Sequence, residues 1–468
     1  MTTTRMLAPT DTIAALATPL GEGGLAVLRI SGAAAMAVAD ACFVPLGSRN
    51  LKASVAPSHT VHYGHLRRGG PGGEILDDVM ITVFRAPRSF TGENTVEISC
   101  HGGVLVTRLI LDVLLASGAR MAEPGEFTQR AFLHGRLDLA QAEAVADLIH
   151  ARTELSLAAA REQLAGRLSA RIRTLRDSLM LTLAHVEAHL DFPDEDISPD
   201  THAGLIRRLA DGRELLDELC RTAPEGQLLR RGIRAAIVGR PNAGKSSLLN
   251  LLLGYERAIV SPIIGTTRDT IEETANVRGL PVVFVDTAGL RLSEDALEAE
   301  GIRRSREAAG RAELLLHVLD TTEELHPEDA LLLAEFVDRP RILVLNKTDL
   351  PRRLDLPSPL PSGVSVISVS CTRGLGLEEL KDALKGLVWR GGVGTESIQI
   401  AISARHHDAL RRSCESLERA EAALASQATL ELVAFDLRTA VGAVGEVVGA
   451  TTTEDLLDRI FSTFCLGK

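Results

Sequence analysis

The segment Gly239-Arg240-Pro241-Asn242-Ala243-Gly244-Lys245-Ser246 decides the class of fold, because it has the pattern GxxxxGK[ST]. The apolar run Ala235–Val238 precedes it and the helical run Ser247–Leu253 follows it. In such a strand–loop–helix context, glycines let backbone N–H groups wrap a phosphate, and the helix N-terminus adds positive potential. We expect Lys245 to reach the β- and γ-phosphates of a nucleotide and Ser246 to ligate Mg²⁺.

Three further motifs follow in an order that predicts guanine nucleotide as the ligand. Gly265-Thr266-Thr267-Arg268-Asp269 lies where a switch loop supplies a threonine to the metal. In Asp286-Thr287-Ala288-Gly289, the carboxylate can hold Mg²⁺ through water and the last amide can sense the γ-phosphate. In Asn346-Lys347-Thr348-Asp349, the carboxylate can accept two hydrogen bonds that guanine offers and adenine does not. Four motifs in order, each at the end of an apolar run, exclude a chance glycine-rich turn.

Other positions around these motifs carry weaker or open signals. Ser370-Cys371-Thr372 stands where GTPases usually carry Ser-Ala-Lys. Leu290 follows the Asp-x-x-Gly motif at the place where small Ras-like GTPases have a glutamine that orients the attacking water. Hydrolysis therefore needs another arrangement, and no arginine finger is recognisable. Arg240 faces either solvent or phosphate.

The segments outside this region predict two further kinds of structure. Residues 1 to 124 mix glycine clusters with apolar runs, and we expect strands at Ala26–Ile30 and Val79–Phe84 with a turn at Gly69–Gly73. The segment Phe127–Leu190 has no proline and an apolar stripe that predicts one long helix from Leu164, ending at Asp191-Phe192-Pro193. The members of the stripe are Leu164, Leu168, Ile172, Leu175, Leu179, Leu183, Val186 and Leu190.

From residue 228 the pattern alternates between apolar runs and helical stretches, which is typical of a parallel sheet with crossover helices. The predicted strands are Ala235–Val238, Val282–Val285, Leu314–Val318, Ile342–Leu345 and Val366–Val369. After residue 391 we expect helices at Arg405–Leu424, Thr429–Val448 and Glu454–Phe464. The predicted fold is multidomain α/β: an N-terminal α+β domain at 1–124, a discontinuous helical domain at 125–227 and 392–468, and an inserted Ras-like P-loop domain at 228–391.

Composition narrows the class of protein. The formal charge of −11 argues against broad, sequence-independent binding to nucleic acid, so an RNA substrate would need a basic pocket or a basic partner. The six cysteines are scattered, which favours free thiols and a reducing compartment. No apolar run approaches the roughly 20 residues of a membrane span, and the N-terminus lacks the features of a signal peptide, so we expect a cytoplasmic protein.

Short matches along the whole chain give a family resemblance. They include Leu28-Arg29-Ile30-Ser31-Gly32, Phe90-Thr91-Gly92-Glu93-Asn94-Thr95-Val96-Glu97, Pro124-Gly125-Glu126-Phe127-Thr128-Gln129-Arg130-Ala131-Phe132 and the terminal Phe464-Cys465-Leu466-Gly467-Lys468. With the order of domains, these segments resemble the MnmE (TrmE) family of tRNA-modification GTPases. The resemblance implies a homodimer joined through the N-terminal domains. It also implies an FAD-dependent MnmG-type partner, in a heterotetramer or larger complex, that acts with it on tRNA.

The family resemblance also implies cofactors and site residues. A 5-formyl- or methylene-tetrahydrofolate would supply a one-carbon unit for a carboxymethylaminomethyl or aminomethyl group at C5 of the wobble uridine, position 34. Folate would be held by Arg29, Glu97, Arg136 and Lys468, although family members commonly have lysine at position 136. K⁺ would replace an arginine finger, bound by Asn242 and by the backbone of Ser261, Ile263 and Thr266, while Mg²⁺ would be bound by Ser246 and Thr267.

The resemblance assigns catalytic roles to Glu298, which would position the water, and to Asn242 and Lys245. Glu300 is the obvious alternative to Glu298. Cys465 is either a nucleophile toward C6 of uracil or a small buried residue or redox bystander. The full set expected to bind GTP is Asn242, Ala243, Gly244, Lys245, Ser246, Ser247, Ser261, Pro262, Ile263, Ile264, Gly265, Thr266, Thr267, Asp286, Thr287, Ala288, Gly289, Asn346, Lys347 and Asp349.

Two rival functions remain open at this point. One is a ribosome-assembly or trafficking GTPase without chemistry of its own on RNA. The positions that match the folate set and the terminal Cys-Leu-Gly-Lys argue against it. The other is a folate-dependent one-carbon transferase with a GTPase merely appended, which predicts turnover of folate without GTP and without the FAD partner.

Overall fold

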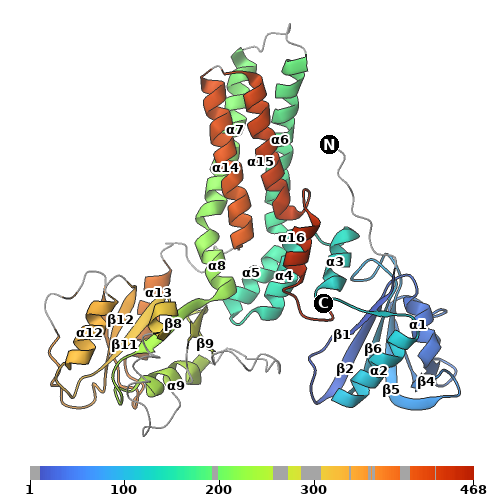
Figure 1. Cartoon of the computed structure of the whole chain (residues 1–468), viewed down its shortest axis with the longest axis horizontal. Helices are drawn as coiled ribbons and strands as arrows, with labels where there is room; N and C mark the ends of the chain where they lie inside the picture. Colours follow the sequence, from blue (N-terminus) through green and yellow to red (C-terminus); the bar gives the residue numbers. More distant parts are fainter. Residues whose placement is uncertain are drawn as a thin grey trace. The chain divides into compact units, whose positions relative to one another are not determined.

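The structure is a computed structural model that describes residues 11–191, 199–256, 272–285, 307–336, 339–356, 360, 364–389, 401–426 and 428–468. The chain divides into two compact units, each with its own β-sheet (Figure 1). The first unit contains Met1–Ala146, Leu168–Leu209 and Ser416–Lys468. The second contains Asp147–Arg167 and Ala210–Glu415. Within the described ranges, no helix combines the length and the apolar character needed to cross a bilayer.

A seven-stranded sheet in the order β3-β4-β5-β6-β2-β1-β7 forms the base of the first unit. The strands are β1 (Ile13–Leu16), β2 (Gly23–Ser31), β3 (Phe43–Pro45), β4 (Thr60–Arg68), β5 (Glu74–Phe84), β6 (Thr95–Gly102) and β7 (Arg120–Met121). All neighbouring strands are antiparallel except β1 and β7. The predicted strands at Ala26–Ile30 and Val79–Phe84 are confirmed as parts of β2 and β5.

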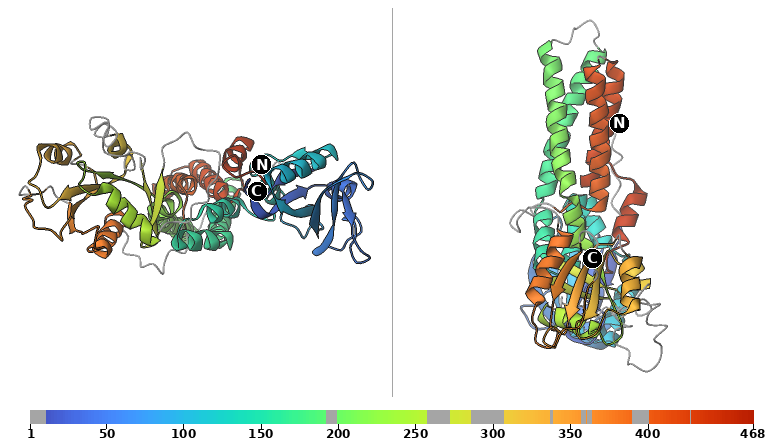
Figure 2. Two further views of the ribbon diagram at one scale, coloured as in Figure 1. Left: turned by 90° about the horizontal axis from the view of Figure 1, so that it is seen from below. Right: turned by 90° about the vertical axis from the view of Figure 1, so that its left-hand side faces the viewer.

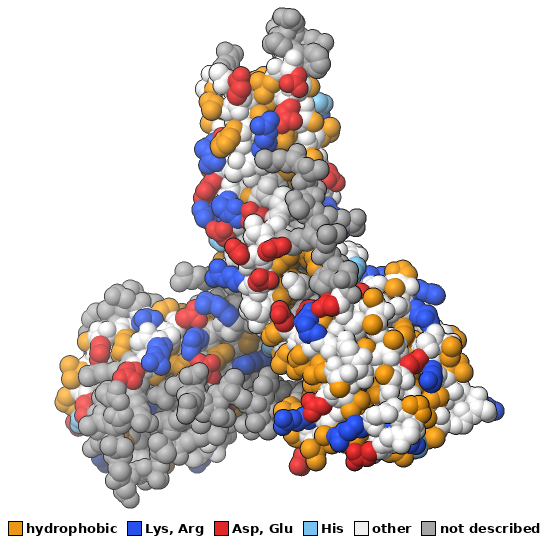
Figure 3. All heavy atoms as spheres, turned by 45° about the vertical axis from the view of Figure 1, so that its right-hand side comes forward, with side chains coloured by type: hydrophobic (Ala, Val, Ile, Leu, Met, Phe, Trp, Pro, Cys, Tyr) orange, Lys and Arg blue, Asp and Glu red, His pale blue; other side chains and the backbone are white. Residues whose placement is uncertain are grey.

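Two helices cover one face of this sheet, and the core lies between the two layers. They are α1 (Ala35–Cys42) and α2 (Val104–Ala116) (Figure 1). Leu28, Ile81 and Ile98 on three adjacent strands are fully buried in this core. Alternate residues of β4 point away from it, and Val61 and Tyr63 are 57% and 43% exposed. The visible face of the N-terminal part of the chain carries many hydrophobic side chains (Figure 3).

The C-terminal end of the chain packs on helices that follow the N-terminal sheet. The helices that follow the sheet are α3 (Glu126–Leu133) and α4 (Leu139–His150), and the C-terminal helix that packs with them is α16 (Glu454–Phe461). Leu139, Phe461 and Phe464 are buried in one apolar cluster with Phe132 packed against it. The helix expected at Glu454–Phe464 ends three residues early, because Ser462, Thr463 and Phe464 turn the chain back toward α3.

A four-helix arrangement completes the first unit. Within this unit, α6 (Arg167–Asp191), the start of α7 (Pro199–Arg221), the end of α14 (Ala404–Ala425) and α15 (Leu430–Val448) lie side by side (Figures 1 and 2). Ion pairs join them: Arg419 binds Asp436 at 2.8 Å, and Arg438 binds Glu187 at 2.7 Å. The helices expected at Arg405–Leu424 and Thr429–Val448 are confirmed as α14 and α15.

The prediction of one long helix beginning at Leu164 is wrong at its start. Leu164 is the last residue of a separate helix, α5 (Glu154–Leu164), and α6 begins three residues later. The break is at Ala165 and Gly166, where Gly166 has a φ of 84°, a conformation that favours glycine and ends a helix. The predicted end at Asp191 is confirmed.

The second unit contains a six-stranded sheet in the order β13-β12-β11-β8-β10-β9. The strands are β8 (Ile233–Val238), β9 (Glu273–Val277), β10 (Leu280–Phe284), β11 (Leu314–Asp320), β12 (Arg341–Asn346) and β13 (Ser365–Ser368). The five predicted strands are confirmed, and they pair in parallel. A sixth strand that was not predicted, the short β9, adds an antiparallel hairpin with β10 at one edge.

Helices α9 (Lys245–Glu256) and α13 (Leu377–Val388) share an apolar core with the sheet, and α12 (Pro327–Glu335) lies between β11 and β12 in the chain. Leu248, Leu316 and Leu380 are each fully buried in that core. Helices α5 and α8 (Ala223–Arg231) pack against β10. The carboxyl ends of β8, β12 and β13 lead into the loops that carry Gly239–Ser246, Asn346–Asp349 and Ser370–Thr372.

Candidate functional site

The loop between β8 and α9 is held in a conformation that few residues other than glycine can adopt. Gly239 and Gly244 have φ values of 139° and 96°. A Cβ at Gly239 would overlap the Val318 carbonyl oxygen, and a Cβ at Gly244 would overlap Asn346 Nδ2. Asn242 has a φ of 62°, which asparagine tolerates better than most residues do. The loop is therefore built by its glycines and shaped before a ligand arrives.

Lys245, the first residue of α9, lies folded back across this loop. Its Nζ donates a 2.6 Å hydrogen bond to the Arg240 carbonyl oxygen. Burial lowers the pKa of Lys245 to about 8, against the attraction of Asp329. The side chain is thus a poorly solvated cation, which an anion would stabilise. The Arg240 side chain points elsewhere, because its Nη1 donates a 2.9 Å hydrogen bond to Glu323.

Asn346 connects the phosphate loop to the last loop of the site. Its buried side chain donates from Nδ2 to the Ala243 carbonyl oxygen at 2.8 Å and accepts at Oδ1 from the Cys371 N–H at 3.2 Å. Lys347 has a φ of 65° and pairs with Asp320 at 2.5 Å. Asp320 was not predicted from sequence. The sequence signal for Asp320 was its position as the last residue of β11, the strand that precedes the strand leading into the Asn-Lys-x-Asp motif.

Asp349 is oriented by the segment that looked weakest in the sequence. Ser370 Oγ donates a 2.7 Å hydrogen bond to Asp349 Oδ1, and Thr372 Oγ1 lies 3.5 Å from Oδ2. The Ser370 bond lowers the pKa of Asp349, so this carboxylate is an acceptor at neutral pH. Asn346, Asp349, Ser370 and Cys371 therefore converge at the carboxyl end of β12, beside the phosphate loop.

Several predicted residues lie outside the described part of the chain, and their placement is not given. They are Ser261, Pro262, Ile263, Ile264, Gly265, Thr266, Thr267, Asp286, Thr287, Ala288, Gly289, Leu290, Glu298 and Glu300. Of the predicted metal ligands, Asn242 and Ser246 are described and lie in or directly after the loop. Among the residues that the structure describes, no group of three or more His, Cys, Asp and Glu side chains is arranged to hold a metal ion.

A second polar cluster lies in the first unit, on the N-terminal sheet. Arg29 on β2 stands opposite Glu97 on β6, and its Nε and Nη2 lie 2.9 and 2.7 Å from Glu97 Oε1. The Arg29 guanidinium carbon is 5.5 Å from the Phe90 ring centre and 5.6 Å from that of Phe127. Aromatic rings at this distance attract a guanidinium and limit its movement.

The C-terminal residues complete this cluster. The N–H of Phe127 donates to the Lys468 carbonyl oxygen at 3.2 Å, and Gly467 packs so closely on Leu16 that a Cβ there would overlap the Leu16 carbonyl oxygen. Burial and the neighbouring Arg29 lower the pKa of Lys468. The structure thus brings Arg29, Glu97 and Lys468 together, with an exposed Cys465 near Lys468.

Arg136 borders the short loop of residues 89–94 at Gly92. Its Cγ is 3.4 Å from the position that a Cβ on Gly92 would occupy. Its backbone N–H donates to the Ala131 carbonyl oxygen at 2.8 Å, which fixes the end of α3. Of the four residues predicted to form one set, three are gathered around Arg29, and the fourth borders the loop that carries Phe90.

The sheet, the phosphate loop and the oriented Asp349 define the second unit as the P-loop domain of a GTP hydrolase. Two family descriptions match the chain: the N-terminus of the GTP-binding protein TrmE over residues 12–136, and the MnmE helical domain over residues 139–465. The chain belongs to the MnmE (TrmE) family of tRNA-modification GTPases.

Individual relatives match over nearly their whole length. The tRNA modification GTPase MnmE of Chloroflexus aurantiacus is 46% identical over 98% of this chain and 100% of its own, and that of Bacillus subtilis is 42% identical over the same shares. Among solved structures, the G domain of the T. maritima FeoB iron transporter is 30% identical, with a TM-score of 0.24. It covers 33% of this chain and 98% of its own.

Proposed function

We propose that this GTPase acts with an FAD-dependent MnmG-type partner to modify C5 of the wobble uridine of tRNA. A one-carbon unit from a 5-formyl- or methylene-tetrahydrofolate, held by the first unit, would enter the carboxymethylaminomethyl or aminomethyl group. The observation that carries this proposal is the convergence of Arg29, Glu97 and Lys468 on the N-terminal sheet. A GTPase that served only as a binding switch would have no need of such a polar cluster outside its nucleotide domain.

The donor set of this cluster suits a folate. Glu97 can accept hydrogen bonds from the amine and amide of a pterin ring, and Arg29 and Lys468 can neutralise glutamate carboxylates. Phe90, which is 37% exposed, offers part of an aromatic face to a planar ring. Arg136, which borders the loop of residues 89–94 at Gly92, would contribute a further cation. The folate itself would supply the one-carbon unit.

In the nucleotide domain, we assign roles to residues by their place in the motifs. Lys245 would bind the β- and γ-phosphates, and Ser246 and Thr267 would hold Mg²⁺. K⁺ would lie near the β–γ bridge, ligated by Asn242, Ser261, Ile263 and Thr266. The glycine-built loop and the hydroxyl at the start of α9 support a phosphate-bound metal at this place. Glu298 would position the attacking water.

We also propose a homodimer joined through the N-terminal domains, and a cytoplasmic location. The exposed apolar side chains of the N-terminal sheet, Val61, Tyr63 and Met80 among them, support a protein partner on that face. None of the six cysteines, all of which lie in the described part of the chain, forms a disulfide, which supports a reducing compartment. We also propose the domain limits 1–124, 125–227, 228–391 and 392–468.

Reconstitution with one component left out at a time tests the function. The complete mixture contains the protein, the FAD partner, tRNA, the folate, GTP and K⁺, and modified uridine is measured by mass spectrometry of tRNA nucleosides. We expect product only when every component is present. Product without folate would refute the one-carbon role. Turnover of the folate without GTP and without the FAD partner would favour a transferase with an appended GTPase. In cells, unchanged tRNA nucleosides in a deletion strain would instead favour a ribosome-assembly or trafficking switch.

A further inference from the structure

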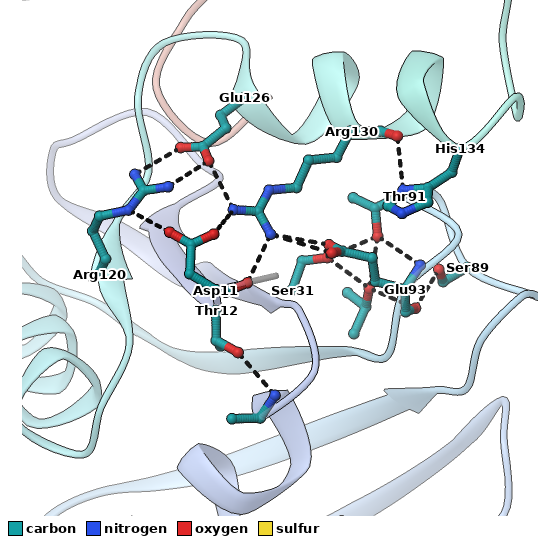
Figure 4. Close-up of polar contacts among 12 residues, drawn as sticks. Asp11, Thr12, Ser31, Ser89, Thr91, Glu93, Arg120, Glu126, Arg130 and His134 are labelled. Carbon is teal, nitrogen blue, oxygen red and sulfur yellow. Dashed lines mark hydrogen bonds and ion pairs between the residues drawn. The ribbon is translucent and has the colours of Figure 1, made fainter. Parts of the chain in front are cut away.

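A buried ionic network lies beneath the loop of residues 89–94, which we call the Phe90 loop. At its centre is Arg130 of α3, whose side chain is 0% exposed (Figure 4). Its Nη2 binds Asp11 Oδ1 at 2.7 Å and Glu126 Oε1 at 2.8 Å, and its Nη1 binds Glu93 Oε1 at 3.2 Å. A buried guanidinium persists only with such partners, because an unpaired charge is costly to remove from water.

Glu93 is the residue through which this network holds the Phe90 loop. Its carboxylate accepts from Ser31 Oγ at 2.7 Å as well as from Arg130. Its carbonyl oxygen accepts from Ser89 Oγ at 2.6 Å, and Thr91 Oγ1 lies 2.7 Å from Ser31 Oγ. Figure 4 shows the side chains of Ser31, Thr91 and Glu93 turned toward one another. The loop is therefore tied to β2 through Thr91 and Glu93 and to α3 through Glu93, while Ser89 bonds to Glu93 within the loop.

Two other residues of the Phe90 loop, Phe90 and Gly92, lie next to residues predicted to bind the ligand. The Phe90 ring lies 5.5 Å from the Arg29 guanidinium carbon. Gly92, with a φ of 81°, leaves the space that the Arg136 and His134 side chains border. The loop thus contacts Arg29 through Phe90 and Arg136 through Gly92. Its Glu93 is fixed by Ser31 and Arg130.

We propose that Glu93 and Arg130 are positioning residues for the ligand site, fixing the Phe90 loop so that Arg29 and Arg136 stand ready before the ligand arrives. The ligand class is a planar heteroaromatic ring with an anionic tail. This inference rests on the folate site of the proposed function. Neither Glu93 nor Arg130 contacts the ligand in this scheme. They act through Phe90 and Gly92, in the way that pre-organisation strengthens binding by removing the cost of ordering a loop.

Glu93→Gln in the full-length protein tests the proposal, because glutamine keeps the shape and removes the charge that Arg130 requires. We expect the affinity for 5-formyltetrahydrofolate, measured by calorimetry, to fall roughly tenfold or more, as for loss of a hydrogen bond to a charged group. Hydrogen exchange of the amides in residues 89–94 should rise in the free protein, because the loop loses its anchor. Basal GTP hydrolysis should be unchanged.

Two controls separate positioning from a general loss of stability. Val79→Ala opens a small space in the core of the same sheet and should lower Tm without touching the Phe90 loop. Glu74→Gln removes a carboxylate from an exposed pair with Arg68 and should change nothing. If Val79→Ala, at an equal or larger loss of Tm, weakens folate binding as much as Glu93→Gln does, the positioning role is wrong.

Two other outcomes are decisive. Unchanged affinity and unchanged exchange in Glu93→Gln would overturn the proposal. If the wild-type protein does not bind the folate, the proposed function fails, and the exchange measurement alone then decides whether Glu93 fixes the loop. Should Glu93→Gln not fold, Ser31→Ala removes one of the two donors to Glu93 and keeps the ion pair. It should produce a smaller rise in exchange at residues 89–94, and no rise would count against the proposal.

Discussion

The side chain of Asn346 donates a 2.8 Å hydrogen bond to the carbonyl oxygen of Ala243, so the guanine motif and the phosphate loop are joined directly. The same amide group fills the space beside Gly244 in which a Cβ would have to stand. Base recognition and phosphate binding are therefore not independent in this site. A change that displaces Asn346 from either side disturbs both.

Gly244→Ala should strongly weaken the binding of guanine nucleotides. The new Cβ would overlap Asn346 Nδ2, and a φ of 96° is strained for alanine. With strain of 1–3 kcal/mol at such a position, we expect roughly tenfold weaker binding or more in a titration with labelled GDP. Gly254→Ala is the matched control, because nothing lies within 4 Å of a Cβ there. Equal affinity of the two variants would contradict this reading of the loop.

Asp349→Asn should change the base preference of the site from guanine to xanthine. The carboxylate, held by Ser370, can accept from two donors of guanine, whereas an amide presents one donor and one acceptor. Binding of GTP should weaken and binding of xanthosine triphosphate should improve. Competition between the two nucleotides against a labelled analogue measures both changes. An unaltered affinity for GTP would remove Asp349 from base recognition.

Nucleotide binding should take up a proton at alkaline pH. In the nucleotide-free protein, the pKa of Lys245 is lowered to about 8 by burial, and the phosphates should raise it again. Below about pH 8 the side chain is charged with or without ligand, so no proton moves. Above it, binding must first charge Lys245, and affinity should fall as pH rises. Calorimetry in buffers of different ionisation enthalpy should find uptake at about pH 9 and none at about pH 7. Lys245→Arg, always charged, should bind nucleotide without uptake at either pH.

Hydrolysis should be markedly faster in K⁺ than in Na⁺. Leu290 cannot orient water, so we expect a cation at Asn242 to stabilise charge at the β–γ bridge and Glu298 to position the nucleophile. Asn242→Ala should abolish the preference for K⁺ with modest loss of GTP affinity. Glu298→Ala should lower kcat on the order of 10²-fold or more while K⁺-dependent association of the nucleotide domains persists. Similar rates in both salts would refute the cation role, and an inactive Glu300→Ala beside a near-normal Glu298→Ala would identify the other glutamate.

Deletion of Cys465–Lys468 should weaken folate binding and leave basal GTP hydrolysis nearly intact. The deletion removes the cation beside Arg29 and the hydrogen bond from the Phe127 N–H to the Lys468 carbonyl oxygen. Lys468→Ala separates the loss of charge from the loss of the backbone contact. Equal affinities of the truncated and intact proteins in calorimetry would exclude Lys468 from the site.

The sequence predicted the nucleotide domain well, because its strands are largely apolar runs and the motifs in its described part follow the ends of those strands. The prediction of helix and strand limits failed where the spacing of apolar residues and the backbone geometry conflict. The stripe from Leu164 continues through Gly166, yet the backbone turns there. The edge strand β9 is short and pairs locally, so no apolar run announced it. The Ser370 segment departs from the usual residue types, but its hydroxyl still reaches Asp349.

The network around Arg130 was the least predictable part. Arg130 and Glu126 are buried although their residue types seldom are, and only tertiary structure brings them together with the exposed Asp11. Their short motifs were visible in the sequence as points of family resemblance, without a physical role. A residue pattern does not report that a charged side chain is buried. The burial of Arg130 and Glu126 gives these motifs a physical role.

The packing of Gly467 and Lys468 on β1 and α3 has a consequence for how the protein is made. The strands that carry Arg29 and Glu97 leave the ribosome early, and their sheet can form while synthesis continues. The residue that completes their cluster is added only after the nucleotide domain and the helices have been translated. Because closing so long a loop is entropically slow, the site matures last. A nascent or C-terminally clipped chain would carry a finished nucleotide domain and an Arg29–Glu97 pair without Lys468.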